Sequence, residues 1–507
     1  MKSTFRVSRK YRKVLRNRKR RIERRLAPRH WKQQPEPMMR GSNIHYEVSD
    51  KTRANSYGGL GAIHAMVQRV GLVKEIDEHL ELLKVHLPYH ESDHVLNVAY
   101  NILAGGVRME DIELRRQDEG FLNGLGAQRI PDPTTAGDFT RRFKRQDILD
   151  MMEAINGARQ RVWSEQPRGF LERAVIDVDG TIAGTLGQCK GGMDISYKGI
   201  WGYAPLIVSL ANTKEVLYLV NRPGNAVSHQ GAAPWIDRAI DLVQPQAGAV
   251  HLRGDTDFSL TWKFDQWDEA GVTFNFAMDA NPQLVALAES LSEAQWWGLV
   301  RAARDIKTQP RECPENVKER IVRERGYRNQ RLQSEQVAEL EYRPGKCRKS
   351  YRLVVLRKNL SIERGENVLF DDLRYFFYIS NRRELERDEI VQDANQRCDQ
   401  ENVVEQLKNG VNAMRMPVDD LESNWAYLVM AALAWNLKAW FGLLMPNRER
   451  GQELVKMEFR SFLGAVLLMP AQIIRAGRKI IYRILSYNRW LKDFLATWER
   501  LRRMETG

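Results

Sequence analysis

AVIDVDGTI, at residues 174–182, opens the run of elements that decides the fold. Its β-branched residues predict a strand, and two further strands are predicted at YAPLIVSLAN, residues 203–212, and at EVLYLVNR, residues 215–222. Only Thr213 and Lys214 separate the last two strands, so we expect a hairpin there. The first three strands should therefore be antiparallel neighbours.

Beyond this hairpin, helix and strand alternate along the chain. APWIDRAIDLV at 233–243 predicts a helix, AVHLRGD at 249–255 a strand, residues 259–270 a helix and VTFNFAM at 272–278 a strand. Strands that are joined by helical crossovers can pair in parallel. The sequence therefore predicts an α/β core with a mixed sheet and packed helices, in the element order of the RNase H-like fold.

The pattern then becomes irregular and β-rich over residues 309–384. ELEYR, SYRLVVLRK and YFFYISN predict strands that interrupt the α/β order, so we interpret this segment as an inserted β-rich subdomain. The chain returns to helix at 382–410, which ends at Gly410.

Helical patterns dominate both ends of the chain. Residues 57–165 predict an all-helical domain, which we interpret as a probable DNA-binding domain. Residues 421–507 predict an apolar helix followed by an amphipathic, basic helical tail. The most apolar stretch, Trp425 to Trp435, is about half as long as a bilayer span requires. We therefore expect a buried core helix and no membrane association.

These patterns divide the chain into six segments. They are a basic Arg-rich arm and linker (1–56), the helical domain (57–165), the first part of the RNase H-like core (166–308), the β-rich insertion (309–384), the catalytic-helix part of the core (385–420) and a helical C-terminal region (421–507).

The basic residues are concentrated in the arm. Residues 1–40 hold sixteen Lys and Arg and two acidic residues, Glu23 and Glu36, so this segment carries a net charge of +14. The whole chain also has a net charge of +14, so the charges of the other residues cancel. Such a block is typical of a segment that binds a polyanion, and its arginine content favours nucleic acid. A solvated tail without a specific role is the alternative. We expect phosphate contacts from the centre of the block, at Arg16, Arg18, Lys19, Arg20 and Arg21.

The four cysteines lie too far apart in sequence for a zinc-knuckle pattern. A disulfide framework is not expected in a chain of 507 residues, so a reducing, cytoplasmic setting fits best.

Acidic residues mark the ends of two predicted core strands. Asp177 and Asp179 are two apart on the first strand and so share one face, although Asp-Gly is also a common turn pair. Asp255 ends the fourth strand, where open sheets bind ligands, and the first and fourth strands should be adjacent. Asp257 is either another ligand or, as we prefer, the N-cap of the following helix.

A third acidic group comes from the helix near residue 401. Arg397, Glu401, Glu405 and Lys408 have the spacing of one helical face, a pattern that a solvated, salt-bridged face also shows. A catalytic site is favoured over a solvated face by the combination of a strand Asp, a strand-end Asp and a helix Glu in this order. The residues alone do not decide between Asp177 and Asp179, or between Glu401 and Glu405.

Together these motifs resemble bacterial insertion-sequence transposases of the DDE superfamily, and the insertion-sequence 1380 group in particular. The matching motifs are Asp-Gly-Thr at 179–181, Arg-Pro-Gly-Asn at 222–225, Leu-Arg-Gly-Asp at 252–255, Glu-Asn at 401–402 and the strand residues Tyr203, Pro205 and Leu206. Arg397, Glu401 and Lys408 fit the signature of the catalytic helix in related transposases, whereas its tyrosine position holds Ala394. The resemblance covers roughly residues 60–480.

The resemblance implies a function and its chemistry. Asp179, Asp255 and Glu401 are implied to be the catalytic metal ligands for two Mg²⁺ or Mn²⁺ ions, and hard carboxylate oxygens suit both metals. Arg397 and Lys408 are implied to contact DNA phosphates. Double-stranded DNA, as element terminal repeats and target, is the implied substrate for cleavage and for strand transfer of the 3′-hydroxyl. A homodimer in the synaptic complex and a location in the bacterial cytoplasm with the nucleoid follow from that reaction.

Three other functions remain open. A nuclease of RNase H-like fold would share the carboxylates but not join DNA. A transposase-derived DNA-binding protein would bind without cutting, and an RNA-binding protein would depend on the basic arm alone. Among the tryptophans, Trp262, Trp267, Trp296 and Trp297 are candidates for stacking on bases, with core packing as the preferred interpretation.

Overall fold

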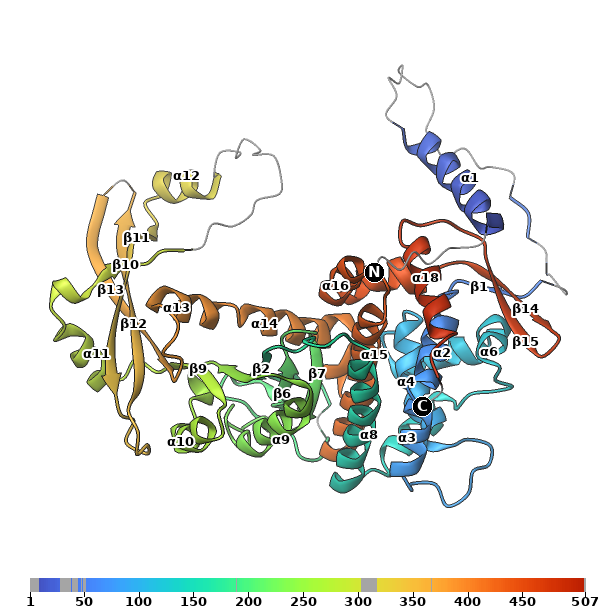
Figure 1. Ribbon diagram of the computed structural model, residues 1–507, viewed down its shortest axis with the longest axis horizontal. Helices are drawn as coiled ribbons and strands as arrows, with labels where there is room; N and C mark the ends of the chain where they lie inside the picture. Colours follow the sequence, from blue (N-terminus) through green and yellow to red (C-terminus); the bar gives the residue numbers. More distant parts are fainter. Residues whose placement is uncertain are drawn as a thin grey trace.

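A computed structural model gives the three-dimensional structure of the protein (Figure 1). It describes residues 9–27, 38, 44–46, 48, 52–187, 189–301, 317–365 and 367–505. Within this part of the chain, the predicted elements of residues 174–278 fold around a large mixed sheet.

The sheet has nine strands in the order β10-β11-β12-β13-β9-β8-β2-β6-β7. Its central strands are β2 (Ala174–Gly180), β6 (Leu206–Leu210), β7 (Glu215–Val220), β8 (Val250–Gly254) and β9 (Thr273–Met278). Strands β2, β6 and β7 are antiparallel neighbours, while β8 runs parallel to both β2 and β9. The predicted hairpin, the adjacency of the first and fourth strands and the mixed sheet are therefore confirmed.

The second predicted strand is divided. Residues 203–212 split into the end of β5 (Trp201–Tyr203) and β6, because Pro205 lies between them and lacks the N–H that a ladder needs. Strand β5 pairs instead with β3 (Ala183–Gly184) and β4 (Asp194–Ile195) in a separate small sheet. This small sheet follows directly on the end of β2.

Helices cover both faces of the large sheet. Phe264 of α10 (Thr261–Glu269) stacks on Phe274 with ring centroids 4.4 Å apart. The next residue, Asn275, donates from its side chain to the Ile390 carbonyl of α13 (Arg387–Asn395) at 2.8 Å. Because consecutive side chains alternate across a strand, α10 and α13 lie on opposite faces. Helix α9 (Ala233–Val243), predicted to the residue, packs against β2, β6 and β7.

The single helix predicted at 382–410 is interrupted. It consists of α13, a turn at Gln396 and Arg397, then α14 (Cys398–Glu405), followed by a π-helical turn at Gln406–Gly410. Helix α14 is held on the sheet by a hydrogen bond from the Ser209 hydroxyl of β6 to Gln400. Figure 1 shows α13 and α14 following one another along one face of the large sheet.

The β-rich insertion continues the core sheet. Its long strands, β11 (Arg328–Tyr342), β12 (Tyr351–Arg364) and β13 (Asn367–Ser380), are antiparallel, and the short β10 (Trp297–Gly298) pairs with β11. Strand β13 pairs with β9 over Phe377–Ser380, which joins the insertion to the strand that follows α10. The three predicted strands cover the end of β11, the start of β12 and the end of β13.

The remaining N-terminal elements are helical. They are α1 (Arg9–Leu26), α2 (Leu60–Arg69), α3 (Leu72–His79), α4 (Glu91–Leu103), α5 (Ile112–Arg116), α6 (Glu119–Leu125), α7 (Pro133–Thr140) and α8 (Arg145–Ser164), with one short strand, β1 (Ala54–Asn55). Two shorter helices, α11 (Pro282–Glu289) and α12 (Val317–Glu324), lie between β9 and β11 in the chain.

Helix α15 (Leu421–Leu443) joins the N-terminal helices to the sheet. It packs against α4 and α8 on one side and against β7 on another. Glu215 of β7 is buried and accepts hydrogen bonds from Arg159, Trp163 and Trp440, which ties both helices to the strand. In the described residues, α15 is the one helix with the length and composition of a membrane span, and its apolar window is wholly buried in the protein.

The prediction of a wholly helical C-terminal region was wrong. Besides α16 (Arg448–Lys456), α17 (Phe459–Phe462) and α18 (Leu491–Leu501), it contains the hairpin β14 (Ala471–Ala476) and β15 (Lys479–Ile484). Gly477 and Arg478 both have positive φ, 52° and 59°, which a two-residue hairpin turn requires. The isoleucine pairs on either side of this turn favour strand over helix.

Candidate active site

Asp179 and Asp255 lie at the same edge of the large sheet, on neighbouring strands. Asp179 is on the last part of β2, and Asp255 follows β8 directly. The guanidinium of Arg397, from the turn between α13 and α14, lies between them, with Nη1 3.5 Å from Asp179 Oδ2 and 4.0 Å from Asp255 Oδ2. The sheet and the interrupted helix thus bring together two of the three predicted carboxylates and the predicted arginine.

Burial shapes the electrostatics of this edge. The pKa of Asp179 is raised to about 6, because desolvation and the carboxylates of Asp255 and Glu401 together outweigh the lowering effect of Arg397. The pKa of Asp255 is also raised by burial, against the effect of Arg397. Glu401, on α14, is exposed to solvent within electrostatic range of Asp179. The three carboxylates repel one another, so a cation at this edge is stabilised.

Lys408 faces the same carboxylates from the π-helical turn. Burial lowers the pKa of its amine, Glu405 and Asp179 raise it, and Lys198 lowers it. Glu405 itself is exposed and accepts a hydrogen bond from Asn409 at 2.6 Å. Lys408 is therefore within electrostatic range of Asp179, and Lys198, from the turn between β4 and β5, is within electrostatic range of Lys408.

Asp177 has a different role from Asp179, although both side chains project from the same face of β2. Asp177 is 1 % exposed, and its two carboxylate oxygens accept from Nε and Nη2 of Arg253, at 2.8 and 2.9 Å. Arg253 also donates to the Asp393 carbonyl at 3.2 Å. This buried ion pair uses both oxygens of Asp177, which sets it apart from Asp179 and Asp255 beside Arg397.

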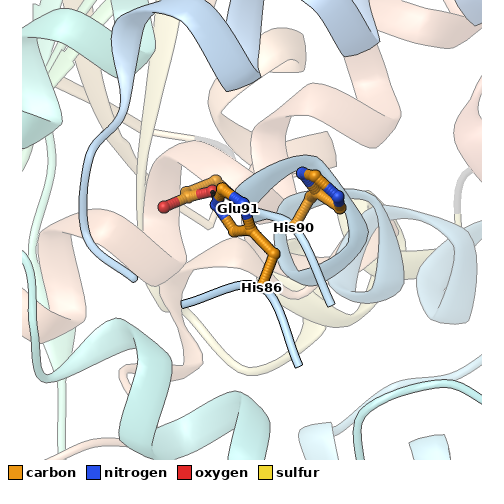
Figure 2. Close-up of side chains that lie close together, drawn as sticks. All are labelled: His86, His90 and Glu91. Carbon is orange, nitrogen blue, oxygen red and sulfur yellow. Dashed lines mark hydrogen bonds and ion pairs between the residues drawn. The ribbon is translucent and has the colours of Figure 1, made fainter. Parts of the chain in front are cut away.

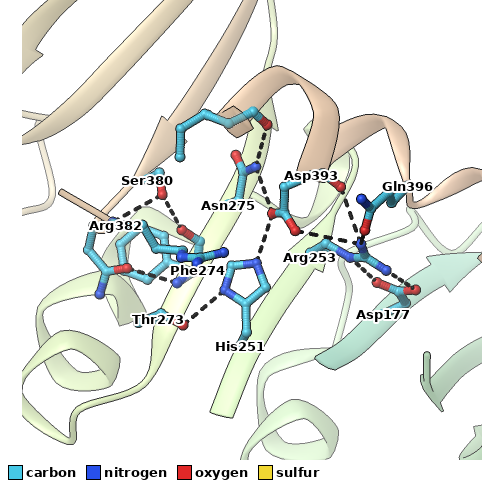
Figure 3. A network of polar contacts seen from close by, with 12 residues as sticks. Asp177, His251, Arg253, Thr273, Phe274, Asn275, Ser380, Arg382, Asp393 and Gln396 are labelled. Atoms are coloured by element: carbon cyan, nitrogen blue, oxygen red, sulfur yellow. Dashed lines mark hydrogen bonds and ion pairs between the residues drawn. The ribbon is translucent and has the colours of Figure 1, made fainter. Parts of the chain in front are cut away.

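A wider polar network links that ion pair to α13 (Figure 3). Asp393 accepts from His251 Nε2 at 2.9 Å and from Asn275 Nδ2 at 3.0 Å. Burial opposes ionisation of Asp393, yet these hydrogen bonds and Arg253 bring its pKa to about 2. Sequence reasoning missed this network. Its signal was the polar residues His251, Arg253 and Asn275 at alternate positions of otherwise apolar strands.

The helix-cap prediction for Asp257 was also wrong. Asp255 is the residue that caps the short 3₁₀ turn at Thr256–Phe258, because its Oδ1 accepts from the Asp257 amide at 3.1 Å. The side chain of Asp257 is exposed. Asp257 and Asp279, which follows β9, both raise the pKa of Asp255, so two additional acids border the site.

The described residues contain one group of three metal-ligating side chains with donor atoms within 4.8 Å of one another, and it lies elsewhere: His86, His90 and Glu91. Figure 2 shows these side chains at the start of α4. Glu91 accepts from the amides of Leu82 and Leu83 and from His86 at 3.0 Å. These bonds fasten the loop before α4, so we assign Glu91 a structural role.

The basic arm contains a helix, α1, over Arg9–Leu26. Arg16, Lys19, Arg20 and Arg21 are exposed on α1. Arg18 instead donates from Nη1 to the carbonyls of Ile484 and Ser486, at 2.9 and 3.1 Å, next to the C-terminal hairpin. Arg18 therefore anchors the helix, which distinguishes it from its neighbours.

Comparison with known proteins gives the family. The family model described as transposase DDE domain, group 1, matches residues 38–506. None of the curated proteins matches the chain. Among solved structures, it is similar to piggyBac transposase in a synaptic complex with hairpin DNA, with 11 % identity, a TM-score of 0.36 and coverage of 82 % of this chain and 84 % of that one. Because the family model spans most of its length, the chain belongs to the group 1 family of transposase DDE domains.

Proposed function

We propose that the protein cleaves DNA at the ends of an insertion sequence and transfers the released 3′-hydroxyl into target DNA. The observation that carries this proposal is the pair of desolvated carboxylates, Asp179 and Asp255, around the Arg397 guanidinium, with Glu401 in electrostatic range. Buried like charges at a strand-end edge are costly unless a cation or substrate uses them. The core that holds them is proposed to be RNase H-like.

The donor set fits divalent magnesium or manganese. Asp179, Asp255 and Glu401 offer only hard carboxylate oxygens, which are the ligands that these ions prefer. When bound, two such ions supply activation of the attacking oxygen and stabilisation of the leaving one. The protein's own contribution is to hold Asp179 and Asp255 at the ends of two neighbouring strands, with Glu401 on the helix beside them.

Cationic side chains would position the DNA backbone. Arg397 and Lys408 flank Asp179, and a phosphodiester at this edge brings negative charge to both. Arg397 can offer two parallel N–H groups to phosphate oxygens, which orients the phosphate as well as binding it. The exposed residues of α1, Arg16, Lys19, Arg20 and Arg21, would add contacts that do not depend on sequence.

The wider assignment rests on the same reaction. The substrates are double-stranded terminal repeats and target DNA, and synapsis of two ends requires a homodimer at least. We place the protein in the insertion-sequence 1380 group, in the bacterial cytoplasm with the nucleoid. Residues 57–165 are proposed to bind DNA. The core is proposed to comprise 166–308 and 385–420. The other segments are the arm and linker (1–56), the insertion (309–384) and the C-terminal region (421–507).

The test is cleavage and joining of DNA that carries the element's own ends, with Mg²⁺ or Mn²⁺. Asp179→Asn, Asp255→Asn and Glu401→Gln should each lose at least 100-fold in cleavage while still binding DNA, since each removes a charge that metal ions require. The matched control is Asp241→Asn, an exposed acid on α9, which should cut nearly as well as wild type.

Three results would reject the proposal. Cleavage without joined products would make the protein a nuclease. DNA binding without metal-dependent cleavage would make it a DNA-binding protein. Cleavage by all three variants at the wild-type rate would show that the carboxylates are not the metal ligands.

A further inference from the structure

The small sheet stands directly beside the carboxylate edge. Strand β3 begins three residues after Gly180, and its Ala183 and Gly184 pair with Tyr203 and Gly202 of β5. The Thr181 amide donates to the Pro205 carbonyl at 3.0 Å, which fixes the crossing point. The hairpin formed by β4 and β5, residues 194–203, therefore extends beyond the end of β2 that carries Asp179.

The base of this hairpin is tightly held. Tyr203 is fully buried, and its hydroxyl donates to the Gly191 carbonyl at 3.0 Å. Arg222 donates from Nε to the Ala204 carbonyl at 2.8 Å. A Cβ on Gly224 would lie 2.2 Å from the Asp194 carbonyl oxygen, so the Arg-Pro-Gly-Asn run packs directly on the hairpin. The base of the 194–203 hairpin is therefore rigid, and its other end projects from that base.

Large aromatic side chains are exposed on that end. Tyr197 is 85 % exposed and Trp201 is 54 % exposed, with Ile200 between them in sequence at 42 %. The structure buries Trp267 and Trp296, two of the tryptophans that the sequence suggested for stacking. An exposed aromatic cluster on a rigid hairpin is suited to a flat partner, because the rings lose little conformational freedom on binding.

The charge around the rings is positive. Lys198, at the tip of the hairpin, lies 5.4 Å from the Tyr197 ring centroid and within electrostatic range of Lys408. The two amines disfavour each other, and Lys408 is also in range of Asp179. A phosphate between the hairpin and the π-helical turn would relieve this repulsion. Flat rings beside the Lys198 amine, with Lys408 in electrostatic range, match the bases and backbone of a nucleic-acid strand better than an apolar protein surface.

We propose that the 194–203 hairpin is a base-stacking element, in which Trp201 and Tyr197 stack on unpaired bases next to the phosphate at Asp179. Lys198 and Lys408 hold the phosphate that connects those bases. The inference rests on the proposed function for the position of the DNA strand. It adds a binding element that recognises unpaired nucleotides at the cleavage site.

The test compares DNA ends that are fully paired with ends that carry unpaired nucleotides, one of which is 2-aminopurine. Binding is measured without divalent metal, so that no cleavage occurs. Trp201→Ala should weaken binding of the unpaired substrate by about 5- to 150-fold and remove the fluorescence change of 2-aminopurine. Binding of the fully paired duplex should be unchanged. Trp201→Phe, which keeps a flat ring, should recover most of the effect.

Tyr327→Ala is the control, because Tyr327 is an aromatic residue that is 52 % exposed before β11, outside the hairpin. The inference is overturned if Trp201→Ala behaves as wild type, or if Tyr327→Ala shows the same loss. It is also overturned if Trp201→Ala changes only the oligomeric state in light scattering, since the surface would then bind protein. A wild-type protein that quenches 2-aminopurine but never cuts DNA would reject the proposed function and keep the stacking element.

Discussion

Nη1 of Arg397 lies 3.5 Å from Oδ2 of Asp179 and 4.0 Å from Oδ2 of Asp255. The guanidinium thus occupies the charge-compensating position that divalent ions would take. Because one positive group screens both acids, we expect the proposed metal ions to compete with Arg397 for these carboxylates, and a bound phosphate to draw the arginine away.

Replacing this arginine should therefore separate metal binding from catalysis. We expect Arg397→Ala to bind Mn²⁺ more tightly in the absence of DNA, by about tenfold, or ~1.4 kcal/mol. The same variant should lose DNA cleavage, since it lacks the two parallel N–H groups that would orient the phosphate. Titration of free Mn²⁺ by electron paramagnetic resonance gives the affinity, with the exposed Arg415→Ala as the control. Unchanged Mn²⁺ affinity would contradict the competition.

Asp177 and Asp179 should respond in opposite directions to the loss of charge. Asp177→Asn removes the carboxylate that pairs at two points with the buried Arg253, although Asp393 Oδ1 stays 3.7 Å from that guanidinium, and breaking a buried pair costs about 3–5 kcal/mol. Asp179→Asn removes a carboxylate whose pKa is raised to about 6, so its ionised form destabilises the fold at neutral pH. Thermal unfolding without metal at pH 7 should show a lower midpoint for Asp177→Asn and an equal or higher midpoint for Asp179→Asn. Equal losses would refute the distinction.

The network around Asp393 predicts a pH dependence of stability. Its pKa of about 2 lies below the unfolded value of about 3.9, so the ionised form stabilises the fold above that value. This contribution is lost as pH falls from about 4 to 2. Asp393→Asn should lower the unfolding midpoint at pH 7, and the difference from wild type should shrink towards pH 2. A constant difference across this range would argue against an ionised Asp393.

Salt dependence should distinguish residues within the arm. Combined replacement of Arg16, Arg20 and Arg21 by Ala should reduce the slope of log affinity against log salt by about 2.7, at ~0.9 for each phosphate contact. Arg18→Ala should leave the slope nearly unchanged, because its guanidinium is bound to the carbonyls near β15. Filter binding between low and physiological salt measures both. A full change of slope for Arg18→Ala would show that this anchor opens on DNA.

The core was predictable from sequence because its signals are local. The β-branched run before Asp179, the helix at 233–243 and the hairpin between β6 and β7 each follow from nearby residues. The placement of Asp179 and Asp255 on adjacent strands followed from element order. Their catalytic role remains a prediction.

Other features depend on contacts between distant residues. Nothing local shows that Asp177 pairs with Arg253, or that Asp393 meets His251 across 142 positions of sequence. The turn before α14 was hidden because its residues are compatible with continuous helix, and Trp201 could not be separated from core tryptophans without its exposure. The hairpin of β14 and β15 had a local turn signal, Gly477 with Arg478, that helical periodicity obscured.

The pairing of β13 with β9 has a consequence for shortened versions of the protein. Excision of the insertion would leave Asn275–Met278 as an open edge strand, with amides and carbonyls unsatisfied beside Asp279. Such an edge is a template for aggregation. It would also remove Val337, Val354 and Tyr378, the residues against which Ile390 of α13 packs. A minimal catalytic fragment therefore has to retain these strands as a protective edge, whatever their part in binding DNA.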